Sequence, residues 1–154
     1  MSDLGIAIAV HLVSVVWWLG GIAFVTAVML PAVARGLGSD PHEAFRRIEQ
    51  RFAPQARVAV ILAGLSGGYL LWRLGAWTWL GHAAFWWLDA MIGYWLLFVL
   101  LLFVIEPLGL MRRAMHYGNV DSDRFLYRMI RVHALLLVIG LVIVGGAAAG
   151  SHGY

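Results

Sequence analysis

An uncharged run over residues 4–34 limits most strongly what this chain can fold into. The run contains no Asp, Glu, Lys or Arg, and it exceeds the roughly 20 apolar residues with which an α-helix crosses a ~30 Å hydrocarbon core. Apolar stretches over approximately 52–73, 83–112 and 122–149 follow it. A helix satisfies its own backbone hydrogen bonds, as lipid requires. The sequence therefore predicts an all-α integral membrane four-helix bundle, with residues 1–154 forming a single domain.

The composition supports a membrane protein and narrows its chemistry. Only 12% of the residues are charged, whereas soluble domains have about 25%. Four spans use nearly all of the 154 residues, which leaves no room for a soluble catalytic domain. The chain has no cysteine, so disulfides, iron–sulfur clusters and thiolate metal sites are excluded. Any metal would have to be held by His, Met or carboxylates.

The arginines indicate the orientation of the bundle. The chain has no lysine, and all but one of its arginines flank the first and third connections between the apolar stretches. They are Arg35, Arg46, Arg47, Arg51 and Arg57 at the first, and Arg112, Arg113, Arg124, Arg128 and Arg131 at the third. Short loops rich in arginine stay cytoplasmic, which predicts an N-out/C-out protein of a bacterial-type inner or plasma membrane. Because the basic residues are split between two membrane-flanking segments, we expect lipid contact and no nucleic-acid binding.

Two acidic residues lie close to the apolar stretches. Asp89 and Glu106 are expected to need partners, because an isolated charge is unfavourable near hydrocarbon. Arg73 is the expected partner of Asp89. Pro107 is predicted to break or kink the third helix, because proline cannot continue the helical hydrogen-bond pattern.

Aromatic and small residues also follow a membrane pattern. Five tryptophans are expected to form an aromatic belt at the outer interface: Trp72, Trp77, Trp79, Trp86 and Trp87. Gly64 and Gly68 lie one turn apart and have two explanations. They allow close helix packing, or they leave room for a flat cofactor.

His11 is the residue most indicative of function. It lies ~10 Å of helix rise after Leu4, and an ionisable side chain inside a membrane is by default a functional candidate. It shares a helical stripe with Ser14 and Trp18. The alternative is that His11 only forms a hydrogen bond to a neighbouring helix.

Possible partners of His11 follow from the depth of each residue. Met91 lies about as far inside the third helix as His11 lies inside the first, and His with Met is a known pair of haem-iron ligands. The same pair suits copper(I). His82 is the alternative partner if the second turn folds back into the membrane. His133 lies at the cytoplasmic end of the last helix, where it belongs to a second, weak site or is a polar boundary residue.

Residues 11–21, HLVSVVWWLGG, resemble the first-helix signature of CopD-like copper-resistance membrane domains and of the related HemJ-type protoporphyrinogen oxidases. Residues 51–54, RFAP, and 67–71, GGYLL, are similar to the segment leading into the second helix of these families and to that helix itself. The resemblance covers most of the four-helix core. A HemJ-type relationship implies haem b near His11, whereas a CopD-like relationship implies copper handling.

The sequence departs from the HemJ-type pattern in two helices. That pattern places a lysine in the third helix after Trp-x-His-x, where this chain has residues 87–91, WLDAM. The Asn-Glu feature of the fourth helix is also missing, and residues 131–133, RVH, occupy that region. These departures argue against protoporphyrinogen oxidation, while haem binding remains an expectation.

The leading functional hypothesis is a haem-b-binding membrane protein in electron transfer or redox chemistry. A haem-dependent membrane oxidoreductase is one form of it, served by a redox partner or by a homo-oligomer. His11 is the expected axial ligand, with Met91 or His82 opposite. The alternatives are a CopD-like copper transport or resistance protein using His11 and Met91, and a cofactor-free accessory subunit of a membrane respiratory complex.

Overall fold

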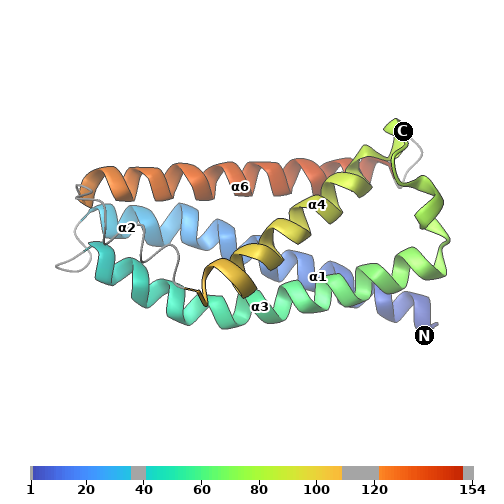
Figure 1. The fold of residues 1–154 in the computed structure, drawn as a ribbon, viewed down its shortest axis with the longest axis horizontal. Helices are drawn as coiled ribbons and strands as arrows, with labels where there is room; N and C mark the ends of the chain where they lie inside the picture. The colour runs from blue at the N-terminus through green and yellow to red at the C-terminus, as the bar shows by residue number, and fades with distance from the viewer. Residues whose placement is uncertain (1, 36–40, 109–121, 151–154) are drawn as a thin grey trace.

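A computed structural model describes residues 2–35, 41–108 and 122–150 (Figure 1). Every regular element in these ranges is helical, which confirms the all-α membrane bundle. In chain order the elements are α1 (Asp3–Phe24), the π-helical segment η1 (Val25–Met29), α2 (Leu30–Ala34), α3 (Pro41–Arg73), the 3-10 turns η2 (Ala76–Trp79) and η3 (Ala83–Phe85), α4 (Trp86–Leu100), the π-helical segment η4 (Leu101–Ile105) and α6 (Ser122–Gly150).

Three of the helical segments are long and apolar enough to cross a membrane. They are Asp3–Ala34, Ala83–Ile105 and Leu126–Gly150. The chain is therefore a multi-pass membrane protein whose helices contact a lipid bilayer. Helix α3 is comparably long, but its uncharged part covers only residues 58–72, between Arg57 and Arg73.

The long helices lie alongside one another with alternating direction (Figure 1). Helix α1 begins and α6 ends at the same end of the bundle, where the turns η2 and η3 also lie. The first turns of α3 and α6 lie at the opposite end, together with Arg47, Arg51, Arg124 and Arg128. Arg112, Arg113 and the expected end of the third helix at 109–112 lie outside the described residues.

Helix α3 begins at Pro41, well before the expected start near residue 52. Its first part is amphipathic, which hydropathy alone does not detect. Glu43 and Arg47 form an i,i+4 ion pair of 2.7 Å on its exposed side, a spacing that supports a helix. On the other side, buried Ile48 belongs to an apolar cluster with Leu30 and Leu126. Tertiary packing therefore extends the helix beyond its lipid-facing part.

The centre of the bundle is an aromatic cluster packed on small residues. The Trp18 ring of α1 lies 5.4 Å from the ring of Tyr94 and 4.8 Å from that of Phe98, measured between centroids. Ala59 and Ala63 of α3 complete this cluster from another side. The Tyr94 hydroxyl donates to the Leu136 carbonyl of α6 at 2.8 Å. The aromatic rings thereby connect all the long helices.

Each π-helical segment lies shortly before a proline. In each case five π-helical residues are followed by one further residue and then by Pro31 or Pro107. Proline has no N–H, and its ring collides with the carbonyl four residues earlier. A π turn relieves the collision by shifting the hydrogen bonds to i−5, as in the 3.0 Å bond from the Glu106 N–H to the Leu101 carbonyl. The irregularity predicted at Pro107 is thus a widening just before the proline.

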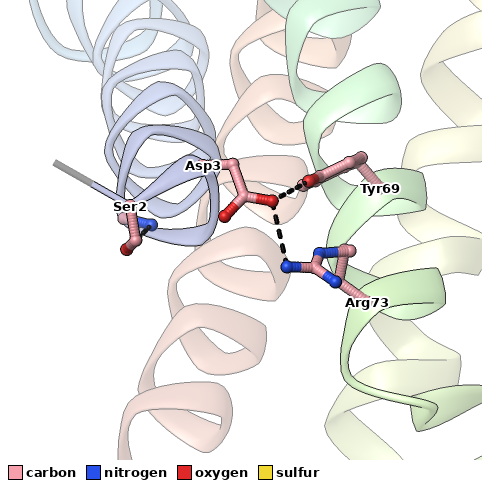
Figure 2. Close-up of polar contacts among 5 residues, drawn as sticks. Ser2, Asp3, Tyr69 and Arg73 are labelled. Atoms are coloured by element: carbon pink, nitrogen blue, oxygen red, sulfur yellow. Dashed lines mark hydrogen bonds and ion pairs between the residues drawn. The ribbon is translucent and has the colours of Figure 1, made fainter.

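A polar cluster joins the start of α1 to the end of α3 (Figure 2). The Asp3 carboxylate accepts hydrogen bonds from the Tyr69 hydroxyl at 2.7 Å and from the Arg73 guanidinium at 3.0 Å. The expected pairing of Arg73 with Asp89 is therefore wrong. Asp89 instead accepts the Gly81 N–H at 3.1 Å, which stabilises a turn where Gly81 has a φ of 77°. Asp89 is therefore bound to the turn that contains Gly81, whereas Arg73 pairs with the Asp3 carboxylate.

Gly64 and Gly68 have different surroundings, so the two explanations given for them, close helix packing and open space, apply to one glycine each. A Cβ added to Gly64 would lie 2.5 Å from the Trp95 ring, which donates its indole N–H to the Val60 carbonyl at 2.9 Å. A Cβ on Gly68 would meet nothing within 4 Å. Gly64 therefore serves close packing, and Gly68 borders open space.

This difference gives a matched pair of variants. Gly64→Ala is expected to lower the free energy of unfolding by about 1 to 2 kcal/mol, because the Trp95 ring, which is hydrogen-bonded to Val60, has to move. Gly68→Ala is expected to be neutral or stabilising, because alanine favours a helix over glycine. Thermal unfolding in detergent measures both. Equal midpoints for the two variants would contradict the packing role of Gly64.

Candidate cofactor site

His11 is held against α3 by two hydrogen bonds. Its Nδ1 lies 3.1 Å from the Ala63 carbonyl oxygen and 3.1 Å from Ser66 Oγ. The Ser66 hydroxyl donates to the Leu62 carbonyl at 2.5 Å, so its oxygen accepts the bond from His11. Since a carbonyl can only accept, Nδ1 carries the proton and Nε2 carries the lone pair. This tautomer is the one in which an imidazole ligates a metal through Nε2.

A glycine allows the imidazole to approach α3. A Cβ on Gly67 would lie 3.1 Å from His11 Cε1, so a larger residue there would push the ring away. Ser66 is buried, with 7% of its surface exposed. The residue was visible in the sequence as a hydroxyl inside an apolar run, but its link to His11 depends on how α1 and α3 pack.

Met91 lies on α4, where its half-buried side chain packs against the central cluster. Trp18 and Phe98 are in ring contact, and His11 and Met91 each precede one of them by about two helical turns. Because α1 and α4 run in the same direction, the two residues are expected to have similar depth. Their joint ligation of one ion remains a prediction.

His82 is exposed in the connection between η2 and η3. Its backbone N–H donates to the Trp79 carbonyl at 3.2 Å, and its carbonyl accepts from the Phe85 N–H at 2.8 Å. The connection lies at one end of the bundle (Figure 1). Of the two proposed partners of His11, Met91 is therefore the one inside the bundle.

His133 lies in the wall of a cavity of about 250 Å³ nearer the arginine-rich end. All the long helices contribute to this wall, and the described residues lining it do not include His11, Met91 or His82. The Nδ1 of His133 donates to the Met129 carbonyl at 2.9 Å. The two intramembrane histidines thus belong to different levels of the bundle.

Glu106, which also lines the cavity, is paired with Arg57 of α3. The ion pair measures 3.0 Å, and the side chains are 25% and 34% exposed, respectively. Arg57 Nε also donates to the Leu102 carbonyl at 3.2 Å. In an α-helix that carbonyl would accept from the Glu106 N–H, which bonds to Leu101 in the π segment. Arg57 therefore satisfies both the charge and the carbonyl freed by the π turn.

Sequence reasoning did not detect the cavity or its π-helical borders. Pro31 and Pro107 were the available signals, because each requires a local adjustment of the helix before it. Two buried indole N–H groups, those of Trp18 and Trp87, have no hydrogen-bond partner within the described ranges. Among the same residues, no three His, Asp or Glu side chains come together as a metal cluster.

Comparison with known proteins gives a family for this chain. No curated protein and no solved structure matches it significantly. One family, described as a domain of unknown function (DUF4149), matches residues 13–119. The match covers more than half of the chain, including α3 and α4. The protein therefore belongs to the DUF4149 family.

Proposed function

We propose that this protein is a haem-b-binding integral membrane protein of electron transfer, with His11 as an axial ligand and Met91 opposite. The observation that carries the proposal is the fixed orientation of His11. A metal-ligating histidine commonly donates its second ring N–H to a carbonyl, which orients the ring and makes the ligating nitrogen more basic. The Ala63 carbonyl and Ser66 provide such a partner.

Two glycines of α3 support a flat ligand beside His11. Gly67 lets the imidazole lie close to α3, and the space around Gly68, at the same level, is open. Trp18, Tyr94 and Phe98 pack together in the apolar centre of the bundle. When bound, haem supplies one-electron exchange at its iron, and the ligands and their burial set its potential. His11 and Met91 would hold the group, and α3 would orient His11.

The proposal includes an orientation in the membrane. The described arginines at the starts of α3 and α6 support a cytoplasmic position for that end of a bacterial-type plasma membrane protein. The beginning of α1 and the end of α6 would then lie outside, and His11 would lie in the outer half of the bilayer. Electron exchange would require a redox partner, or a second copy of the chain, at that side.

Copper handling is the second candidate, because imidazole and thioether are suitable ligands for copper(I). Within the described residues no group of three His, Asp or Glu side chains forms around His11. Copper held by His11 and Met91 alone would exchange readily, as transport requires. The CopD-like resemblance of residues 11–21 supports this alternative.

Absorption spectroscopy of the purified wild-type protein tests the proposal. The protein is expressed with adequate haem and purified in mild detergent, and spectra are recorded before and after dithionite. A Soret band that sharpens on reduction, with near-stoichiometric haem b, is the expected result. Copper without a Soret band would favour the second candidate. A colourless, copper-free chain that co-purifies with larger subunits would overturn both and favour an accessory subunit.

A further inference from the structure

The cavity next to His133 is a second candidate site that the haem proposal does not use. It lies between the helices, nearer the arginine-rich end than His11. Its volume of about 250 Å³ lies just below the range, from roughly 300 Å³, of pockets that enclose whole drug-sized ligands. The size suits a single ring whose substituent extends beyond the cavity.

The cavity wall is mainly apolar and strongly aromatic. Trp17 and Trp18 line it from α1, Phe52 from α3 and Phe98 from α4. Aromatic side chains prefer to pack against other rings in offset or edge-to-face arrangements. These four residues favour a flat, aromatic or quinonoid ligand.

A few polar groups interrupt the apolar wall. Glu106, fixed by Arg57, offers carboxylate oxygens that accept hydrogen bonds. His133, whose Nδ1 is held by Met129, offers an imidazole. Trp18 is 93% buried, being 7% exposed, and its indole N–H has no partner among the described residues. Buried donors rarely remain unpaired, so this donor indicates a missing acceptor.

The aromatic wall and the few polar groups together limit which kind of ligand the cavity can bind. A lipid acyl chain would need none of the polar groups. A metal ion would find an almost wholly apolar wall and, within the described residues, no cluster of three His, Asp or Glu side chains. A molecule with one ring, polar oxygens on it and a long apolar tail matches the volume, the aromatic wall and the polar groups together.

The π-helical segments help to explain why space exists here. Val25 of η1 and Leu101, Leu102 and Ile105 of η4 all border the cavity. A π turn widens a helix, and such turns occur frequently at functional sites. The two π turns, each of which comes shortly before a proline, thus border the same cavity.

From these observations we infer that the cavity binds the headgroup of a lipid-soluble quinol. The ring packs among the aromatic residues, and its apolar tail extends toward the lipid. The hydroxyl groups of the quinol donate to the Glu106 carboxylate and to Nε2 of His133, and a quinol oxygen accepts from the Trp18 indole N–H. This site goes beyond the haem proposal and does not rest on it, because none of its residues is His11 or Met91.

Binding of decylubiquinol, kept reduced under anaerobic conditions, to the purified full chain in phosphatidylcholine nanodiscs tests the inference. Bound probe is measured against empty nanodiscs of the same lipid. The decisive variant is Gly21→Leu: Gly21 lines the cavity, and a Cβ there meets nothing within 4 Å. A leucine there is therefore expected to extend into the cavity from a Cβ that meets no neighbour. Saturable binding to the wild type and its loss in Gly21→Leu are the expected results.

Gly20→Leu is the matched control. Gly20 is exposed, has the same open surroundings for a Cβ and is absent from the lining residues, so its variant is expected to bind like the wild type. His133→Leu is expected to weaken binding roughly tenfold by removing one hydrogen bond to the ring. Circular dichroism and gel filtration check the folding of each variant.

Three results would overturn the inference. The first is the lack of saturable binding above the empty nanodiscs. The second is unchanged binding in a folded Gly21→Leu variant. The third is equal competition by decylbenzene, which lacks the oxygens, together with unchanged binding in His133→Leu, because the cavity would then hold only an apolar chain. Each of these results is independent of whether the protein carries haem.

Discussion

The His11→Ala variant is expected to purify without haem and to lose the Soret band of the wild-type protein completely. If His11 is the proposed axial ligand, the substitution removes its imidazole and leaves a single proposed ligand, the Met91 thioether on α4. Ser66→Ala is expected to weaken haem binding roughly 10- to 100-fold, as loss of a hydrogen bond to a ligating histidine commonly does. The Ala63 carbonyl still holds Nδ1 in that variant, so its effect should be partial.

Haem content per protein, and titration of the haem-free protein with haemin, measure both effects. His133→Ala is the matched control, because His133 is also an intramembrane histidine whose Nδ1 donates to a carbonyl. Its spectrum is expected to match that of the wild type. If His11→Ala kept its haem while His133→Ala lost it, the ligand would be the cavity histidine and the assignment of His11 would be wrong.

The Arg57→Leu variant is expected to lower the free energy of unfolding by about 3 kcal/mol. Removing one partner of a buried ion pair leaves the other charge desolvated, which costs about 3 to 5 kcal/mol. The lower end applies because Arg57 and Glu106 keep 34% and 25% of their side-chain surface exposed. The Leu102 carbonyl also loses its donor. The double variant Arg57→Leu/Glu106→Leu is expected to recover most of the loss, because no unpaired charge remains.

A double-mutant cycle from denaturant unfolding in mixed micelles isolates this coupling. The control is Arg47→Leu, which breaks the exposed pair with Glu43. That pair is shorter, at 2.7 Å, but its side chains are 75% and 43% exposed, so a loss below ~0.5 kcal/mol is expected. If the double variant were as unstable as the sum of the single variants, Arg57 and Glu106 would not act as a pair.

The membrane class and the number of long helices were readable from hydropathy, because lipid requires long uncharged runs such as 4–34. The start of α3 was not readable, since residues 41–51 become helical by packing Ile48 against Leu30 and Leu126. Likewise, Arg73 was expected to pair with Asp89 because a carboxylate close to hydrocarbon needs a partner. The turn at Gly81 and the approach of α1 decide instead that Arg73 pairs with Asp3 (Figure 2).

For the candidate site, the sequence by itself determined which side chains lie within apolar segments: His11, Ser66, Met91, Glu106 and His133. Placement inside a span follows from local composition, because the transfer of a helix into lipid depends on its own residues. Only the tertiary structure decided that Ser66 and Ala63 fix the His11 tautomer, that Arg57 pairs with Glu106, and that His133, unlike His11, lines a cavity. These features depend on the rotation and register of packed helices, which distant side chains such as Trp18, Tyr94 and Phe98 set together.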